Sequence, residues 1–427
     1  MSETTLATLS AGLVLVALIA YAVLGGADFG GGVWDLLARG PSAERERDAI
    51  AQAMGPVWES NNVWLIFVLV VTWTAFPIVY AGISAALFIP ITLALIGIVL
   101  RGAAFSFRSH YGMQVGTGVR WGHVFNIAST ITPFLLGAIA GALASGGIRL
   151  SGPPLQVQAN IWATWITPFA LSCGAFALGL CSVLSATYLT AEAHNNGSEV
   201  LTQTFRRRAM ISGAITALFG ALAVTLASSE APTLWHGLIG KALPFSLGAV
   251  VLGLATAAAL FFNAYLVARV LVAAETTCIL LAWSVAQWPY LIVPDVTVTN
   301  AASPASVLGP MLIVALLGIV ILVPSLWYLF SVFKRNPSRP EQATSRGVTT
   351  TTSFVASLPP MVVATDAQAA TDMLSSTDAP RAADVPQFQA IAAFLVAVAS
   401  AIVITGVSSL LRRRYEHSRF YARLRAL

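Results

Sequence analysis

Three ionisable residues lie within or beside strongly apolar runs of the sequence, and they have the clearest capacity for chemistry. Asp28 stands in a glycine-rich stretch, Glu59 stands beside two asparagines, and Arg101 closes a third apolar run. A charge at the centre of a bilayer costs about 2.5–3.5 kcal/mol by insertion scales unless it is paired or solvated. Two carboxylates and a guanidinium could take up protons from the cytoplasm, or they could hold helices together as ion pairs. The residues alone leave both interpretations open.

The glycine-rich stretch GGADFGGG at 25–32 invites comparison with a nucleotide-binding loop. Such loops follow a strand and carry a Gly-Lys-Ser/Thr ending, whereas this stretch follows an apolar helix and has no such ending. We expect either close helix packing or an unwound helix end around Asp28.

No set of residues resembles a cofactor or metal site. A haem needs an axial ligand inside a bundle, and the histidines fall in loops or at span ends, with His123 the nearest to a candidate. The five are His110, His123, His194, His236 and His417. Glu192 and Glu275 are also placed at span ends, as ordinary interfacial residues. Trp58 and Trp64 could line a path for a small molecule, although belt and packing roles explain most membrane tryptophans.

The composition requires a membrane to position these residues. Of 427 residues, 57% are hydrophobic and only 10% are charged, whereas soluble domains have about 25% charged residues. This excludes a cytosolic enzyme, a nucleic-acid-binding protein and a disulfide-rich secreted module. The net charge of +5 comes from basic residues between apolar segments, which orient a membrane protein more often than they bind a polyanion.

The apolar runs predict an all-α polytopic bundle, because a span needs about 20 mainly apolar residues and helices satisfy their own backbone groups in lipid. We expect a tight hairpin between the second and third spans, broken near Pro77 and Gly82. The nine predicted spans are 8–26, 57–79, 81–101, 123–145, 161–189, 208–228, 243–269, 273–291 and 306–333.

The basic residues predict the orientation. Loops after odd-numbered spans hold fourteen Lys and Arg residues, Arg269 among them, and the other loops hold Arg149 and Lys241. Because positive residues stay on the cytoplasmic side, we expect the amino terminus outside and the multi-pass chain in a bacterial inner (plasma) membrane.

The last part of the chain differs in composition. We expect three parts: a transmembrane domain at 1–335, a disordered polar linker at 336–387, and an apolar helix with a basic tail at 388–427. The 24 uncharged residues 388–411 could form a tenth span. The six arginines after them favour an interfacial or re-entrant segment with a cytoplasmic carboxyl terminus.

Four motifs in order resemble subunit II of the cytochrome bd quinol oxidases, over about residues 8–335. They are GGADFGGG at 25–32, GPVWESNNVWLI at 55–66, RGAAFSFR at 101–108 and AQWPYLIVPD at 286–295. The resemblance implies two four-helix bundles plus one peripheral helix. It also implies a heterodimer with subunit I, which carries two b-type haems, haem d and the quinol site. Together such subunits oxidise quinol and reduce dioxygen to water.

The resemblance also assigns roles to individual residues. The family's second subunit is haem-free, so no cofactor is expected on this chain, with membrane lipid and a small single-helix accessory subunit as further partners and no nucleic acid. Asp28 and Glu59 match acidic positions of a proton route, Trp64 matches a tryptophan of an oxygen path, and Arg101 matches a motif arginine. Trp58 is a further oxygen-path or structural candidate. The alternative is a stand-alone secondary transporter or channel, which would have charged residues near the membrane midplane.

Overall fold

The computed structural model describes residues 2–54, 58–111, 116–151 and 156–335. The elements in these ranges are mostly helices, with two short hairpins. They are α1 (Glu3–Leu37), α2 (Ala43–Met54), α3 (Trp58–Ala75), α4 (Pro77–Ala86), α5 (Phe88–Tyr111), α6 (Gly116–Ser145), β1 (Arg149–Ser151), β2 (Gln156–Gln158), α7 (Pro168–Asn195), α8 (Glu199–Glu230), α9 (Pro232–Ile239), α10 (Leu243–Phe261), α11 (Tyr265–Gln287), β3 (Tyr290–Ile292), β4 (Val296–Thr297) and α12 (Ala305–Arg335). The predicted linker at 336–387 and the tail at 388–427 lie outside the described residues.

Within the described ranges, eight helices are long and apolar enough to cross a membrane, and the pair α3–α4 could form a ninth span. The two helices of that pair meet at an angle of 117°. The break falls at Phe76, directly before Pro77, because proline has no backbone N–H and disfavours a helical residue before it. The break predicted at Pro77 is therefore confirmed. The break predicted at Gly82 is wrong, because Gly82 lies inside α4, and the next long helix begins at Phe88.

The predicted span 243–269 is wrong, because the chain reverses direction inside it. α10 ends at Phe261 and α11 begins at Tyr265. Asn263 has a φ of 62°, and two backbone bonds close the turn, from Ala264 N to Ala259 O at 2.8 Å and from Asn263 N to Leu260 O at 3.3 Å. This is a Schellman ending with asparagine in the left-handed position. Hydropathy does not show this turn, because the residues on both sides of Asn263 are apolar.

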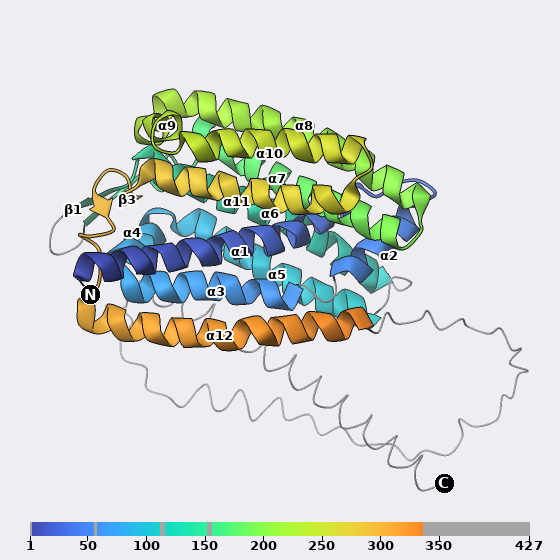
Figure 1. Cartoon of the computed structure of the whole chain (residues 1–427), viewed down its shortest axis with the longest axis horizontal. Coiled ribbons are helices and arrows are strands. Elements are labelled where there is room, and N and C mark those ends of the chain that lie inside the picture. Colours follow the sequence, from blue (N-terminus) through green and yellow to red (C-terminus); the bar gives the residue numbers. More distant parts are fainter. Residues whose placement is uncertain (1, 55–57, 112–115, 152–155, 336–427) are drawn as a thin grey trace, which may run out of the picture. The chain divides into compact units, whose positions relative to one another are not determined.

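The long helices pack mostly against their neighbours in sequence, with α1 at the centre of the contacts (Figure 1). α1 contacts α3, α6 and α7, α5 packs on α6, α7 packs on α6, α8 and α11, and α10 pairs with α11. α12 runs along α3 and α1, on the side away from α8 and α10 in Figure 1. Small residues allow the closest of these contacts: a Cβ on Gly137 of α6 would lie 2.6 Å from the carbonyl oxygen of Cys173 of α7.

The two hairpins lie at one end of the helices. β1 pairs antiparallel with β2 and β3 with β4. Asp295 joins them, because its Oδ2 accepts hydrogen bonds from Arg149 Nε at 2.8 Å and from Leu150 N at 3.1 Å. The largest group of buried apolar side chains lies next to this end and includes Phe76, Ile148 and Ile292.

Candidate functional site

The centre of the candidate site is a buried ion pair between α1 and α5. Arg101 Nη2 lies 2.5 Å from Asp28 Oδ1, and the two side chains are 8% and 2% exposed. Isolated charges would be very costly at this depth, and pairing offsets that cost. The structure therefore brings together two of the residues singled out from the sequence.

Two further helices complete the hydrogen bonding of this pair. Asn61 Nδ2 of α3 donates to Asp28 Oδ2 at 3.2 Å, and Arg101 Nε donates to Ser129 Oγ of α6 at 2.9 Å. The guanidinium also lies over two aromatic rings, 4.7 Å from the centre of Phe29 and 5.0 Å from that of Phe125. These six residues, Asp28, Arg101, Asn61, Ser129, Phe29 and Phe125, form what we call the Asp28 cluster. It joins α1, α3, α5 and α6.

Asp28 and Arg101 lie within their helices and not at the helix ends. α1 continues past Asp28 to Leu37, and α5 continues past Arg101 to Tyr111. Both helices therefore continue beyond the predicted ends of the first and third spans, at residues 26 and 101. α1 is continuous because the glycine-rich stretch is helical, and the alternative of an unwound helix end at Asp28 is wrong.

Close packing explains why the glycines of α1 stay in the helix. A Cβ on Gly30 would lie 2.0 Å from the carbonyl oxygen of Cys181 in α7, and one on Gly32 would lie 2.3 Å from Ser129 Cβ in α6. Real Cβ atoms essentially never come within 3.0 Å of another heavy atom. Glycine therefore allows α1 to approach both helices, and this approach carries Asp28 to Arg101.

The structure says less about the remaining candidates, Trp64, Trp58 and Glu59. Trp64 is half-buried, and its Nε1 has no hydrogen-bond partner among the described residues. Trp58 and Glu59 belong to the first turn of α3, but their side chains lie outside the described part of the chain. Their contribution to the Asp28 cluster stays a prediction.

Sequence reasoning missed several members of the site. Asn61 stands in the quoted motif at 55–66, so its neighbourhood was a signal. Ser129 gave none, because a serine within an apolar helix commonly bonds to its own backbone. Phe29 stands in the quoted motif at 25–32, whereas Phe125 gave no signal, because stacking on the guanidinium depends on the positions of three separate helices.

A second group of buried charges lies where α2 meets α1 and α8. Arg208 Nη2 is 2.5 Å from Glu46 Oε2, and Arg47 Nε is 3.2 Å from Asp35 Oδ1. Glu46 and Asp35 are buried, and the Arg208 guanidinium lies 5.5 Å from the ring centre of Trp34. These pairs attach the polar helix α2 to the long helices. The sequence analysis did not single them out.

The described histidines do not form a haem site. His123, His194 and His236 are all exposed, whereas an axial ligand must point into a bundle. The side chain of His110 and the whole of His417 lie outside the described residues. Among the residues described, no three His, Cys, Asp or Glu side chains are grouped so as to hold a metal ion.

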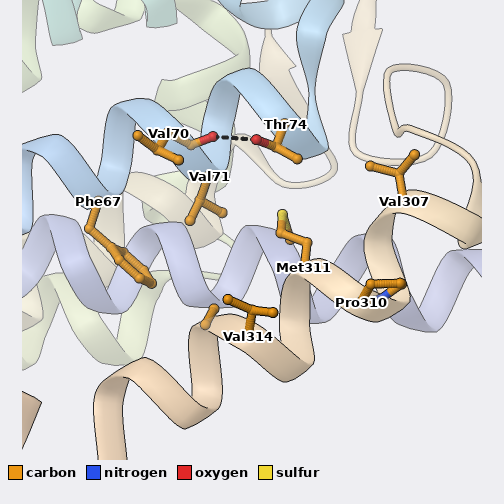
Figure 2. Close-up of a pocket in the computed structure, with 9 residues that line it drawn as sticks. Phe67, Val70, Val71, Thr74, Val307, Pro310, Met311 and Val314 are labelled. Atoms are coloured by element: carbon orange, nitrogen blue, oxygen red, sulfur yellow. Dashed lines mark hydrogen bonds between the residues drawn. The ribbon is translucent and has the colours of Figure 1, made fainter. Parts of the chain in front are cut away.

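An apolar groove lies between α3 and α12, with a volume of about 420 Å³ (Figure 2). The single hydroxyl among its lining residues is that of Thr74, which donates to Val70 O at 2.9 Å. The groove therefore offers an uncharged, apolar surface without a free hydrogen-bonding side chain. Its lining residues are Phe67, Val70, Val71, Thr74, Val307, Pro310, Met311, Val314 and Ala315.

Comparison with known proteins agrees with this architecture. In a solved structure of bd oxidase from Geobacillus thermodenitrificans, one chain aligns with a TM-score of 0.65 at 20% identity, covering 78% of this chain and 99% of that one. At this identity the likeness shows the fold. A provisionally named cytochrome bd menaquinol oxidase subunit II of Bacillus subtilis (strain 168) is 23% identical over 328 residues, which are 74% of this chain and 92% of that protein.

Further relatives match a shorter part of the sequence. The cytochrome bd-I ubiquinol oxidase subunit 2 of Escherichia coli (strain K12) is 29% identical over 189 residues, which are 42% of this chain and 46% of that protein. The family model described as cytochrome bd terminal oxidase subunit II matches residues 6–333. This match takes in every described helix that could span a membrane and both members of the buried Asp28–Arg101 pair. The chain therefore belongs to the cytochrome bd terminal oxidase subunit II family.

Proposed function

We propose that this chain is the haem-free membrane subunit of a cytochrome bd-type oxidase, contributing assembly, an oxygen path and part of a cytoplasmic proton route. Family membership carries the general function, because the chain is thereby a subunit of a quinol-oxidising oxidoreductase complex in a bacterial membrane. The complex carries haem cofactors. We assign two b-type haems, haem d and quinol oxidation to subunit I, and this agrees with the exposed positions of the described histidines.

The finer architecture belongs to the same proposal. We infer a heterodimer with subunit I, two four-helix bundles with α12 as the peripheral helix, and an amino terminus outside the cytoplasm. α12 supports this arrangement because it contacts mainly α3 and α1. Membrane lipid and a small single-helix accessory subunit are further proposed partners, and the parts 1–335, 336–387 and 388–427 remain the proposed domains.

The proposed proton route combines the Asp28 cluster with Glu59. Glu59 precedes Asn61 by two residues in α3, and Asn61 donates directly to the Asp28 carboxylate. A proton accepted near the start of α3 would therefore come close to a buried carboxylate. Asp28 contacts both Arg101 and Asn61, so we propose that Glu59 exchanges protons and that Asp28, next on the route, also holds the helices together.

The proposed oxygen path begins at the apolar groove between α3 and α12. Dioxygen is apolar, so it needs an apolar entrance and gains nothing from charged groups. Phe67 lines the groove three residues after Trp64, so the two side chains lie on neighbouring positions of one face of α3. The short separation between Trp64 and the groove, about one helical turn, supports the proposed path.

A stand-alone transporter, the alternative, would have charged residues near the membrane midplane. The prediction that Glu275 lies at a span end is wrong, because Glu275 lies in the middle of α11. Charge position therefore does not separate the two functions, and family membership decides between them.

The absorbance spectrum tests the proposal most directly. Co-expressed with its haem-bearing partner and purified, the chain should be recovered in a complex with b- and d-type haem bands. Purified alone, it should show no Soret band, since its described histidines do not point into the bundle. A stoichiometric Soret band from the chain alone would refute the assignment.

A further inference from the structure

Glu275 is a carboxylate in the middle of a membrane helix, apart from the Asp28 cluster. It is the eleventh of the 23 residues of α11. At 1.5 Å per residue it lies about 15 Å from Tyr265 and about 18 Å from Gln287 along the helix. Because a hydrocarbon core is about 30 Å thick, this position lies close to the membrane midplane.

The space for this carboxylate comes from a glycine on the neighbouring helix. A Cβ on Gly253 of α10 would lie 2.8 Å from Glu275 Oε1 and 3.7 Å from Oε2. The carboxyl group thus rests against the backbone of α10 where a side chain is missing. The side chain as a whole is half-buried, so it is neither sealed in the bundle nor fully open.

No positive charge neutralises this group within the described ranges, where Glu275 forms no hydrogen bond or ion pair. α10 has no ionisable side chain, and α11 has one basic residue, Arg269. The Arg269 guanidinium lies 4.7 Å from the ring centre of Tyr188 on α7. Arg101 on α5 is already paired with Asp28.

The surface around Glu275 is apolar and exposed on this chain. Next to Gly253 on α10, Val250, Val251 and Leu254 are each more than 60% exposed. An unpaired charge beside such a surface costs about 2.5–3.5 kcal/mol at the bilayer centre, whereas a protonated carboxyl avoids most of that cost. The observations therefore favour a neutral acid that an apolar reagent can reach from the membrane.

We propose that Glu275 is a protonated carboxylic acid at mid-membrane, reached from the lipid side, and the site at which hydrophobic carbodiimides modify this chain. In that reaction the acid proton passes to a carbodiimide nitrogen and a carboxyl oxygen bonds to the central carbon. An acyl shift to nitrogen then gives a stable N-acylurea. The step is an addition, with no oxidation and no leaving group.

The test uses membranes that contain the full chain in its complex. They are treated with dicyclohexylcarbodiimide or with a water-soluble carbodiimide plus an amine, then digested and analysed by mass spectrometry. The apolar reagent should modify Glu275, and the adduct should be absent in Glu275→Gln. The water-soluble reagent should instead modify Glu44 and Asp48, which are exposed on α2.

Each other outcome overturns the proposal. If the apolar reagent leaves Glu275 unmodified in the complex but modifies it after denaturation, the carboxyl is paired with or covered by another molecule. If the water-soluble reagent modifies Glu275 as fast as the apolar one, the site opens to water. Haem content of Glu275→Gln, measured alongside, shows that the variant assembles, so loss of the adduct reports the missing carboxyl.

Discussion

Replacing Gly30 with alanine tests whether glycine packing positions the Asp28 cluster. The added methyl carbon would lie 2.0 Å from the carbonyl oxygen of Cys181, 2.6 Å from its carbonyl carbon and 2.7 Å from Ser185 Cβ. Ordinary contact begins at 3.4 Å, so α1 and α7 would have to separate by roughly 1 Å or more. No rotamer change relieves this clash, because two of the three atoms belong to the backbone of α7.

The magnitude follows from two opposing terms. Alanine favours a helix over glycine by about 0.8–1 kcal/mol, and overpacking in a tight core costs about 1–3 kcal/mol, or more when the backbone must move. The backbone must move here, so the cost lies at the upper end of that range or above it, and we expect a net loss of about 2 kcal/mol or more in the free energy of unfolding. Any weakening of the buried pair between Asp28 and Arg101 adds to this loss, since that pair depends on the position of α1.

Gly12→Ala is the matched control on the same helix. Its Cβ would meet nothing within 4 Å, so only the helix propensity acts and stability should stay equal or rise. Thermal unfolding of the purified complex should therefore give a lower midpoint for Gly30→Ala and an unchanged or higher midpoint for Gly12→Ala. Equal midpoints for Gly30→Ala and the parent would refute the idea that this glycine sets the distance between α1 and α7.

Three further predictions test the site. Arg101→Leu leaves the Asp28 carboxylate unpaired and should destabilise the complex by about 3–5 kcal/mol. Adding Asp28→Asn to this variant should recover part of the lost stability. If the effects of the two substitutions are additive in a double-mutant cycle, the pair does not couple. Glu59→Gln should slow oxygen consumption without lowering haem content, and loss of both together would assign Glu59 a structural role instead. Val314→Trp should raise the KM for oxygen because the larger side chain fills the groove. Val320→Trp is the control, because Val320 lies on the same helix, is as exposed as Val314 and does not line the groove, so its KM should not change. Equal KM values for the two variants would contradict the proposed entrance.

The sequence alone determined the class of protein and the main charged residues of the site. Low charge and long apolar runs leave helices as the way to satisfy backbone groups in lipid, so helical spans could be predicted. Their bounds could not, because α1 runs from Glu3 to Leu37 where the sequence predicted a span at 8–26. Asp28 and Arg101 stood out for the same reason, because a charge is costly wherever the chain is apolar. The motifs around them also identified the family before any helix was placed.

The tertiary structure decided which residues meet and how deep they lie. Hydropathy varies too slowly to show a three-residue turn between two apolar helices, so the reversal at Asn263 and the mid-helix position of Glu275 were missed. The glycine-rich stretch near Asp28 was ambiguous, because glycine favours both helix ends and close packing. The tertiary structure decides between the two, because Cys181 and Ser129, on helices far away in sequence, lie directly against the glycines. These contacts favour close packing of a continuous α1.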